Sequence, residues 1–103
     1  MPASIGWHPW FRRRAERLAD HVESDPLNLV IRAGRRVDID LEGLPTGWLV
    51  DPRTEPKDDV LLDVTEPPVV GWPGGPELTL HAPDAAAWIA YAAHPDGVCV
   101  EPL

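Results

Sequence analysis

The chain has 103 residues, 44% of them hydrophobic, with 13 prolines and 8 glycines. This composition excludes a disordered chain and argues for one domain of short elements joined by turns rather than a bundle of long helices. The net charge of −8 arises from residues 58–103, which hold eight acidic residues and no Lys or Arg. An acidic segment of this kind repels the phosphates of nucleic acid.

The first 41 residues predict three strands and one short helix. Residues 5–13 form a strand with a bend at His8-Pro9, because a residue before proline favours extended backbone. Apolar residues at helical spacing fit a short helix over 15–22. Residues 27–32 and 36–41 read as two strands that form a hairpin. Alternation makes the second strand half-buried, with three apolar side chains on one side: Val37, Ile39 and Leu41.

Loop chemistry at 43–47 precedes a short strand at 48–50, and the polar residues 51–57 with two prolines predict a surface loop. Residues 85–93 fit either a helix, through their alanines, or a strand, through Trp88, Ile89 and Tyr91. Further strands are predicted at 60–64, 69–72, 77–81 and 97–101. About eight short strands favour an all-β fold, a β-sandwich.

One titratable group stands beside several aromatic rings near the start of the chain. His8 follows Trp7 and precedes Trp10 and Phe11. Aromatic rings beside a polar group suit a sugar pocket, because the apolar face of a pyranose stacks on them. The simpler interpretation is that His8 is a packing residue, since geometry rather than residue type makes a site.

Carboxylates occur at two strand ends. Asp58 and Asp59 open one strand, and Glu101 ends another just before Pro102. An imidazole acid facing a carboxylate base could move protons. The alternative is that Glu101 is a solvated terminal residue and that Asp58 and Asp59 are a charged strand entry.

No metal or cofactor is expected. The four histidines are scattered, Cys99 has no partner cysteine, and no glycine-rich phosphate loop precedes a helix. One cysteine permits no internal disulfide. No run of about 18 apolar residues predicts a membrane span, and the N-terminus lacks a signal peptide pattern. We therefore expect a cytoplasmic protein with neither nucleic acid nor membrane as partner.

Five stretches occur in the order found in the aldose 1-epimerases, or galactose mutarotases, and the chain resembles that family over nearly its whole length. The first and last are the most specific. The stretches are 6–11 (Gly-Trp-His-Pro-Trp-Phe), 43–47 (Gly-Leu-Pro-Thr-Gly), 58–61 (Asp-Asp-Val-Leu), 72–74 (Trp-Pro-Gly) and 98–102 (Val-Cys-Val-Glu-Pro).

The resemblance implies a function and roles for particular residues. The family interconverts the α and β anomers of a free aldohexose such as galactose or glucose. By resemblance, His8 is the acid that protonates the ring oxygen and Glu101 is the base that deprotonates the anomeric hydroxyl. Asp58 binds sugar hydroxyls, although Leu61 stands where the family often has an aromatic residue. Trp7 and Trp10 complete the implied sugar-binding residues, and no cofactor is required.

The resemblance covers only the C-terminal half of the family fold, a large β-supersandwich. The N-terminal half of that fold supplies another histidine and an arginine, and neither has a counterpart here. Residues 1–103 are therefore expected to be a single partial domain, which would self-associate through an exposed sheet edge. The alternatives are a carbohydrate-binding remnant without turnover and a truncated product with no independent function.

Overall fold

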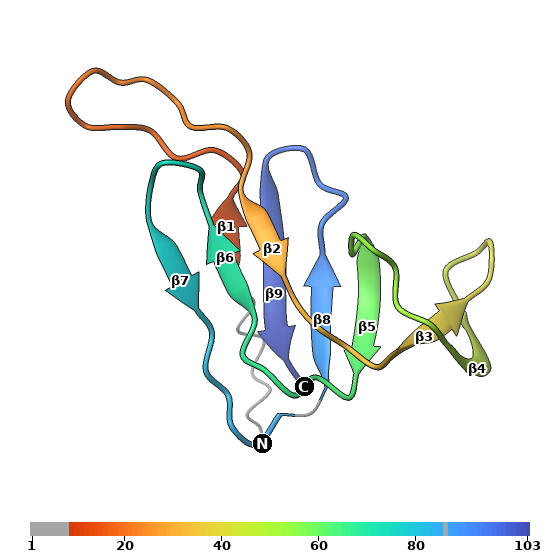
Figure 1. Ribbon diagram of the computed structural model, residues 1–103. Coiled ribbons are helices and arrows are strands. Elements are labelled where there is room, and N and C mark those ends of the chain that lie inside the picture. Colours follow the sequence, from red (N-terminus) through yellow and green to blue (C-terminus); the bar gives the residue numbers. More distant parts are fainter. Residues whose placement is uncertain (1–8, 86) are drawn as a thin grey trace.

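The computed structural model describes residues 9–85 and 87–103, which form nine strands in two antiparallel sheets (Figure 1). The larger sheet has the order β1-β9-β8-β5-β3-β4, and the smaller has the order β2-β6-β7. The predicted all-β sandwich is confirmed. The strands are β1 (Trp10–Arg12), β2 (Asn28–Val30), β3 (Arg35–Ile39), β4 (Pro45–Val50), β5 (Asp58–Leu62), β6 (Val69–Gly71), β7 (Glu77–Thr79), β8 (Trp88–Tyr91) and β9 (Gly97–Pro102).

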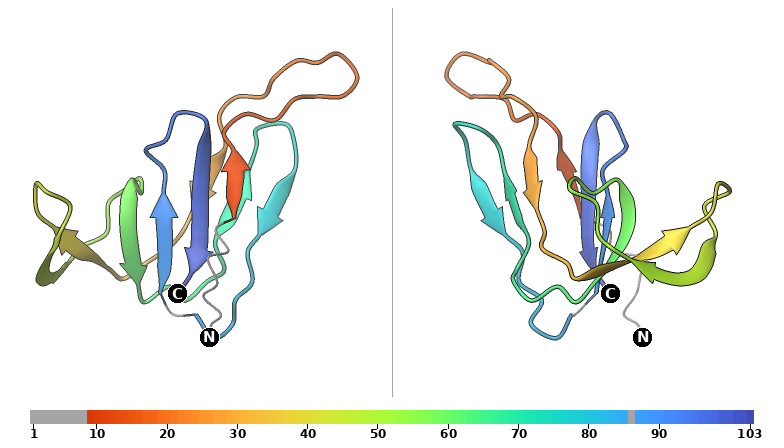
Figure 2. Two further views of the ribbon diagram at one scale, coloured as in Figure 1. Left: turned by 180° about the vertical axis from the view of Figure 1, so that it is seen from behind. Right: turned by 45° about the vertical axis from the view of Figure 1, so that its right-hand side comes forward.

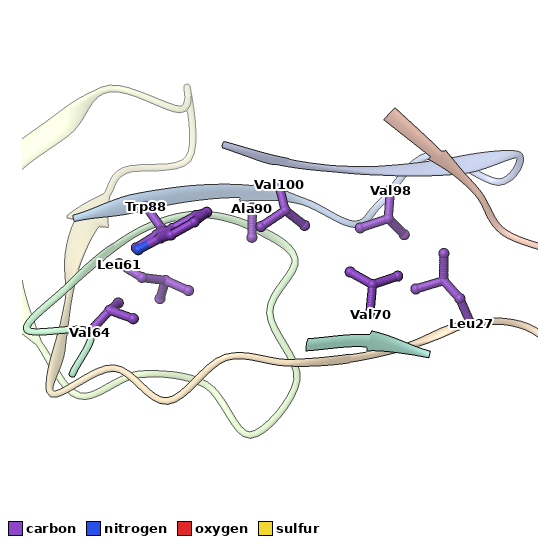
Figure 3. Packing of buried hydrophobic residues seen from close by; sticks show 8 residues of the cluster. All are labelled: Leu27, Leu61, Val64, Val70, Trp88, Ala90, Val98 and Val100. Carbon is purple, nitrogen blue, oxygen red and sulfur yellow. The ribbon is translucent and has the colours of Figure 1, made fainter. Parts of the chain in front are cut away.

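The hydrophobic core lies between the two sheets (Figure 3). Val98 and Val100 of β9 and Ala90 of β8 turn toward Val70 of β6, and each is 0–1% exposed. Leu27, just before β2, closes one end of this cluster. We call the side of the larger sheet that carries these residues the inner face. Because side chains alternate along a strand, the intervening residues of β8 and β9 lie on the opposite, outer face.

The smaller sheet covers only part of the larger one. The β3–β4 hairpin extends beyond it (Figure 2). The radius of gyration, 14.7 Å, accordingly exceeds the roughly 13 Å of a compact chain of this length. The predicted half-buried alternation at 36–41 is wrong at its end, because Ile39 is 36% and Leu41 107% exposed. No second layer reaches these side chains in the part of the chain that the structure describes.

The predicted hairpin over 27–41 is also wrong. β2 pairs with β6 in the smaller sheet, whereas β3 pairs with β4 and β5 in the larger one. The intervening residues cross from one layer to the other. Alternation of apolar residues predicts strands, but it does not select their partners.

Residues 15–22 form an extended loop instead of the predicted helix. Glu16 and Glu23 make an isolated bridge, and the backbone N–H of Arg17 donates to the carbonyl of Val22 at 2.9 Å. Leu18 is 89% exposed. A short helix needs a packed apolar face, and the apolar residues of this loop have no such contact.

The remaining segments agree more closely with the prediction. Residues 51–57 are a loop, and the open choice over 85–93 is settled as strand β8. β4 begins at Pro45, inside the stretch predicted as a loop. The predicted strands at 60–64, 69–72, 77–81 and 97–101 correspond to β5, β6, β7 and β9, with ends shifted by one or two residues.

Arg13 joins the beginning of the larger sheet to the β8–β9 connection. Its guanidinium Nη2 donates to the carbonyls of Ala92 and His94, each at 2.7 Å. Three acceptors lie within reach, since Nη2 also approaches the carbonyl of Gly97 at 3.5 Å. One side chain thereby provides hydrogen bonds to backbone carbonyls of the β8–β9 connection.

Gly34, just before β3, lies against Asp63, just after β5, where these two strands are paired. A Cβ at Gly34 would stand 3.0 Å from the Asp63 Cβ. Asp63 cannot easily retreat, because it has a φ of 59° and accepts a 2.6 Å hydrogen bond from Arg35 Nε. This hydrogen bond also holds the pKa of Asp63 below its usual value.

Gly34→Ala should therefore reduce the free energy of unfolding by about 1–3 kcal/mol through overpacking. Gly75→Ala is the matched control, because its Cβ would meet Trp72 at an ordinary 3.5 Å, and it should change stability by less than about 0.5 kcal/mol. Urea denaturation of the three proteins measures both effects. Equal stability of the two variants would contradict the close contact at Asp63.

Candidate functional site

The strand register assembles the candidate site on the outer face of the larger sheet. Cross-strand partners share a face, and one row runs across four strands from Trp10 through Cys99 and Tyr91 to Asp58. A second row, two residues along, runs from Glu101 through Ile89 to Val60. Trp10, Asp58 and Glu101, which the sequence singles out, therefore occupy one face although they are far apart in the chain.

The spacing between the two carboxylates follows from the sheet geometry. Glu101 and Asp58 are two strands apart and two residues offset along the strands. With strands about 4.8 Å apart and a rise of about 3.4 Å per residue, their Cα atoms are roughly 12 Å apart. Tyr91 and Ile89 of β8 lie between the two carboxylates on the same face.

Glu101 lies on β9, which is not an edge strand of the sheet, and it is only 9% exposed. β9 pairs with β1 as far as Cys99 and with β8 from Cys99 to Pro102, and Glu101 itself is paired with Ile89 of β8. Cys99 lies next to Glu101 on the same face and is 1% exposed. Burial raises the pKa of the Cys99 thiol, and the nearby charge of Glu101 raises it further, which keeps the thiol protonated at neutral pH.

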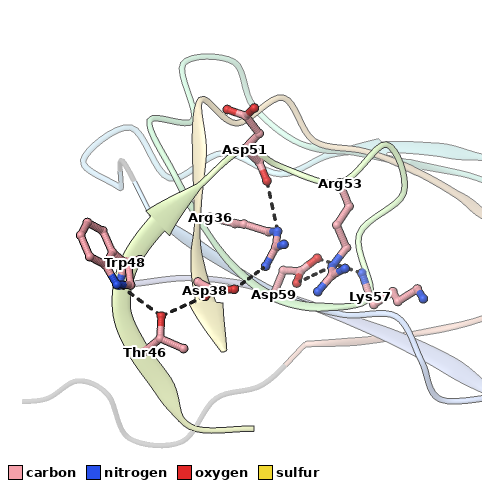
Figure 4. A network of polar contacts seen from close by, with 8 residues as sticks. All are labelled: Arg36, Asp38, Thr46, Trp48, Asp51, Arg53, Lys57 and Asp59. Carbon is pink, nitrogen blue, oxygen red and sulfur yellow. Dashed lines mark hydrogen bonds and ion pairs between the residues drawn. The ribbon is translucent and has the colours of Figure 1, made fainter. Parts of the chain in front are cut away.

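The neighbouring acids Asp58 and Asp59 face opposite ways. Asp58 is exposed and belongs to the outer face. Asp59, 3% exposed, faces inward, where it accepts hydrogen bonds from Arg53 Nε at 3.2 Å and from the backbone N–H of Lys57 at 3.1 Å (Figure 4). Asp59 therefore anchors the 51–57 loop, and only Asp58 is available to a ligand.

Aromatic side chains border the site. Trp10 is 54% exposed, and its ring meets the edge of the His94 ring at a centroid distance of 5.8 Å. Tyr91, 40% exposed, lies between Cys99 and Asp58 in the first row. Tyr91 does not stand out in the sequence as a site residue, because the segment 85–93 fits either a helix or a strand. Once 88–91 is known to be a strand, alternation places Tyr91 on the outer face, because Ala90 is buried on the inner face.

Two of the predicted site residues, Trp7 and His8, lie outside the described residues. The role of His8 as the acid partner of Glu101 stays a prediction from the resemblance. The adjacent Pro9 is described, and its carbonyl lies 3.4 Å from the backbone N–H of Val100. The backbone directly after His8 thus lies beside β9.

Several surface pockets lie elsewhere. One pocket of about 330 Å³ lies between the 15–24 loop and the turn at 73–76, and another of about 380 Å³ lies on the smaller sheet beside Trp72 and Glu77. Within residues 9–85 and 87–103, no three His, Cys, Asp or Glu side chains are placed to hold a metal ion. The same residues include no helix able to span a lipid bilayer.

Comparison with protein-family models, curated proteins and solved structures finds no match for this chain. The resemblance to the aldose 1-epimerases therefore rests on the five sequence stretches alone.

The two adjacent aspartates should respond differently to neutralisation. Asp59→Asn removes the charge that holds Arg53 in a buried contact, and should lower the free energy of unfolding by about 1–3 kcal/mol. Asp58→Asn, on the exposed side of the same strand, should change it by less than about 0.5 kcal/mol. Urea denaturation of both variants provides the measurement, and a larger loss for Asp58→Asn would refute the assigned faces.

The raised pKa of Cys99 predicts a loss of stability at alkaline pH. The unfolded thiol ionises near 9.0, while the folded thiol holds its proton to higher pH. The difference in thiol pKa therefore costs no stability below pH 9. As the pH rises from 9 toward the folded pKa, the free energy of unfolding falls by up to about 1.4 kcal/mol per pH unit. Stability curves from pH 8 to about 10.5 should fall less steeply for Cys99→Ala than for the wild type. Parallel slopes would show that the thiol does not contribute.

Proposed function

We propose that this chain is an aldose 1-epimerase-like protein that interconverts the α and β anomers of a free aldose. The observation that carries the proposal is the presence of Asp58, Trp10 and Glu101 on one sheet face, in the rows that strand pairing defines. The stretches around His8 and Glu101 resemble the catalytic segments of that family. In this proposal, the sandwich is part of a larger supersandwich.

The reaction requires one base and one acid. Glu101 takes the proton from the anomeric hydroxyl while His8 gives a proton to the ring oxygen, and the bond between C1 and the ring oxygen breaks. The open-chain aldehyde rotates about its C1–C2 bond. Reclosure onto the other face of the carbonyl returns both protons and gives the other anomer, so no net oxidation or hydrolysis occurs.

Local structure supports Glu101 in this role. It is paired with Ile89 of β8 within the larger sheet, and a regular strand gives the rigid support that a catalytic group needs. Asp58 projects from the same face and accepts hydrogen bonds from sugar hydroxyls. Trp10, with about half of its surface exposed, offers a ring face on which the apolar side of the sugar stacks.

A second function, binding of carbohydrate without turnover, is favoured by a separate observation. The exposed rings of Trp10 and Tyr91 lie on either side of Cys99 in one row. Such a pair forms a stacking surface that binds sugars without an acid or base. Saturable sugar-induced changes in the NMR spectrum without faster anomer exchange would select this function.

Glu101→Gln should lower the rate of anomer exchange by about 100-fold or more, the usual contribution of a general base. Exchange spectroscopy by NMR on glucose and galactose at equilibrium measures this rate directly. His8→Asn should act similarly, whereas Asp58→Asn should mainly raise KM. Glu77→Gln is the matched control, since Glu77 is an exposed carboxylate on the smaller sheet.

The mechanism is refuted if Glu101→Gln exchanges anomers as fast as the wild type. A wild-type rate no greater than that of buffer alone, with sugar still bound, would leave the binding function. Circular dichroism of each variant establishes that the fold is retained before rates are compared.

A further inference from the structure

The ring of Trp10 extends along the outer face in the direction away from Glu101. A Cβ added at Gly97 would stand 3.4 Å from Trp10 Cε3 and 3.9 Å from Cζ3, so the ring lies against Gly97. The Trp10 backbone is level with Cys99, and Gly97 is two residues further from Glu101 along β9. A glycine in a strand commonly marks such a close approach, and here its missing side chain leaves the space that the ring occupies.

Hydrogen-bonding groups border this ring. The His94 ring lies 5.8 Å away between centroids, with the two planes inclined by 69°. His94 Nδ1 accepts from the backbone N–H of Asp96 at 3.1 Å, so the neutral imidazole carries its proton on Nε2. Arg12 is exposed and pairs with Gly97 across the β1–β9 ladder, which puts it on the same face as Trp10. An exposed ring with donors at its rim suits a sugar.

The connection that carries His94 is held in place. Arg13 Nη2 donates to the carbonyls of Ala92 and His94, each at 2.7 Å, and Arg13 Nε also donates to the His94 carbonyl at 3.2 Å. The ring of His94 is therefore attached to a backbone that the β1 end of the sheet fixes. A surface that is ordered before binding loses little conformational entropy when a ligand binds.

The distance from Glu101 to this ring exceeds the length of one sugar. Gly97 and Glu101 are four residues apart on β9, which is roughly 14 Å at a rise of about 3.4 Å per residue. A pyranose spans roughly 5 Å from its anomeric oxygen to O4, given bonds of about 1.5 Å. Side chains stand roughly perpendicular to a sheet, so a sugar bound by Glu101 through its anomeric hydroxyl ends near the level of Cys99. A second sugar joined to O4 reaches the ring of Trp10.

We infer that Trp10, His94 and Arg12 form a second sugar subsite, and that the outer face prefers a reducing disaccharide or longer oligosaccharide to a monosaccharide. The inference rests on the proposed function, because it takes Glu101 as the group that binds the reducing end. The second ring stacks its apolar face on Trp10, and its hydroxyls accept from His94 and Arg12. This ring does not react, so the subsite lowers KM and leaves kcat unchanged.

The test compares cellobiose with glucose, because the reducing-end ring is the same in both sugars. The wild type should have a KM about tenfold lower for cellobiose, since stacking that removes about 55 Å² of apolar surface from water gives a factor of this size. NMR exchange spectroscopy over a series of sugar concentrations measures KM and kcat for anomer exchange. NMR titration gives the dissociation constant of each sugar independently of turnover.

Trp10→Ala should reduce the preference for cellobiose to less than about twofold, because it removes the stacking surface. Trp48→Ala is the matched control, since it removes the same side chain at a position 74% exposed in β4, at the other edge of the larger sheet. It should keep the preference of the wild type. Circular dichroism of both variants verifies the fold before the sugars are compared.

The inference is overturned if the wild type binds the two sugars equally or binds neither, or if Trp10→Ala keeps the preference for cellobiose. The proposed function fails separately. A chain that binds cellobiose more tightly than glucose through Trp10, yet exchanges the anomers of neither, supports the subsite and refutes the epimerase activity.

Discussion

The contact between β9 and β6 across the sandwich determines the rest of the structure. Val98 and Val100 are buried against Val70, and a strand that buries these two valines must turn Cys99 and Glu101 to the opposite face. A shift of one residue would place a carboxylate in the apolar core, at a large cost in solvation. Core packing therefore also sets the direction of the candidate catalytic base.

The same alternation separates the two acids of β5 into different roles. Asp59 is directed inward, where Arg53 and the backbone of Lys57 compensate its charge. Asp58 is directed outward, level with Tyr91. One strand thus contributes a structural carboxylate and a ligand-accessible carboxylate from consecutive positions.

Local pattern predicted most strands, because apolar alternation between Pro- and Gly-rich turns is a local property. It could not predict that β2 and β3 join different sheets, since partner choice depends on residues distant in the chain. The same holds for the 15–22 loop. Apolar residues at helical spacing form a helix only where another part of the fold packs against them, and the local sequence does not show whether it does. For the site, Asp58 and Glu101 stand out as carboxylates at strand ends, and the resemblance implies their roles. Their common face, and the place of Tyr91 between their strands, depend on a register that only the folded sheet provides.

The hydrogen bonds that Arg13 donates to the β8–β9 connection have a consequence for the order of folding. The guanidinium reaches a carbonyl 81 positions further along the chain, so β1 can be secured only after β8 and β9 have paired. Contacts of such long range close slowly, because loop entropy is lost before they form. Until then the free edge of β9 is open to strands of other molecules. We therefore expect the yield of soluble protein to depend on how fast β1 docks, with rapid synthesis at high temperature favouring aggregates of partly folded chains.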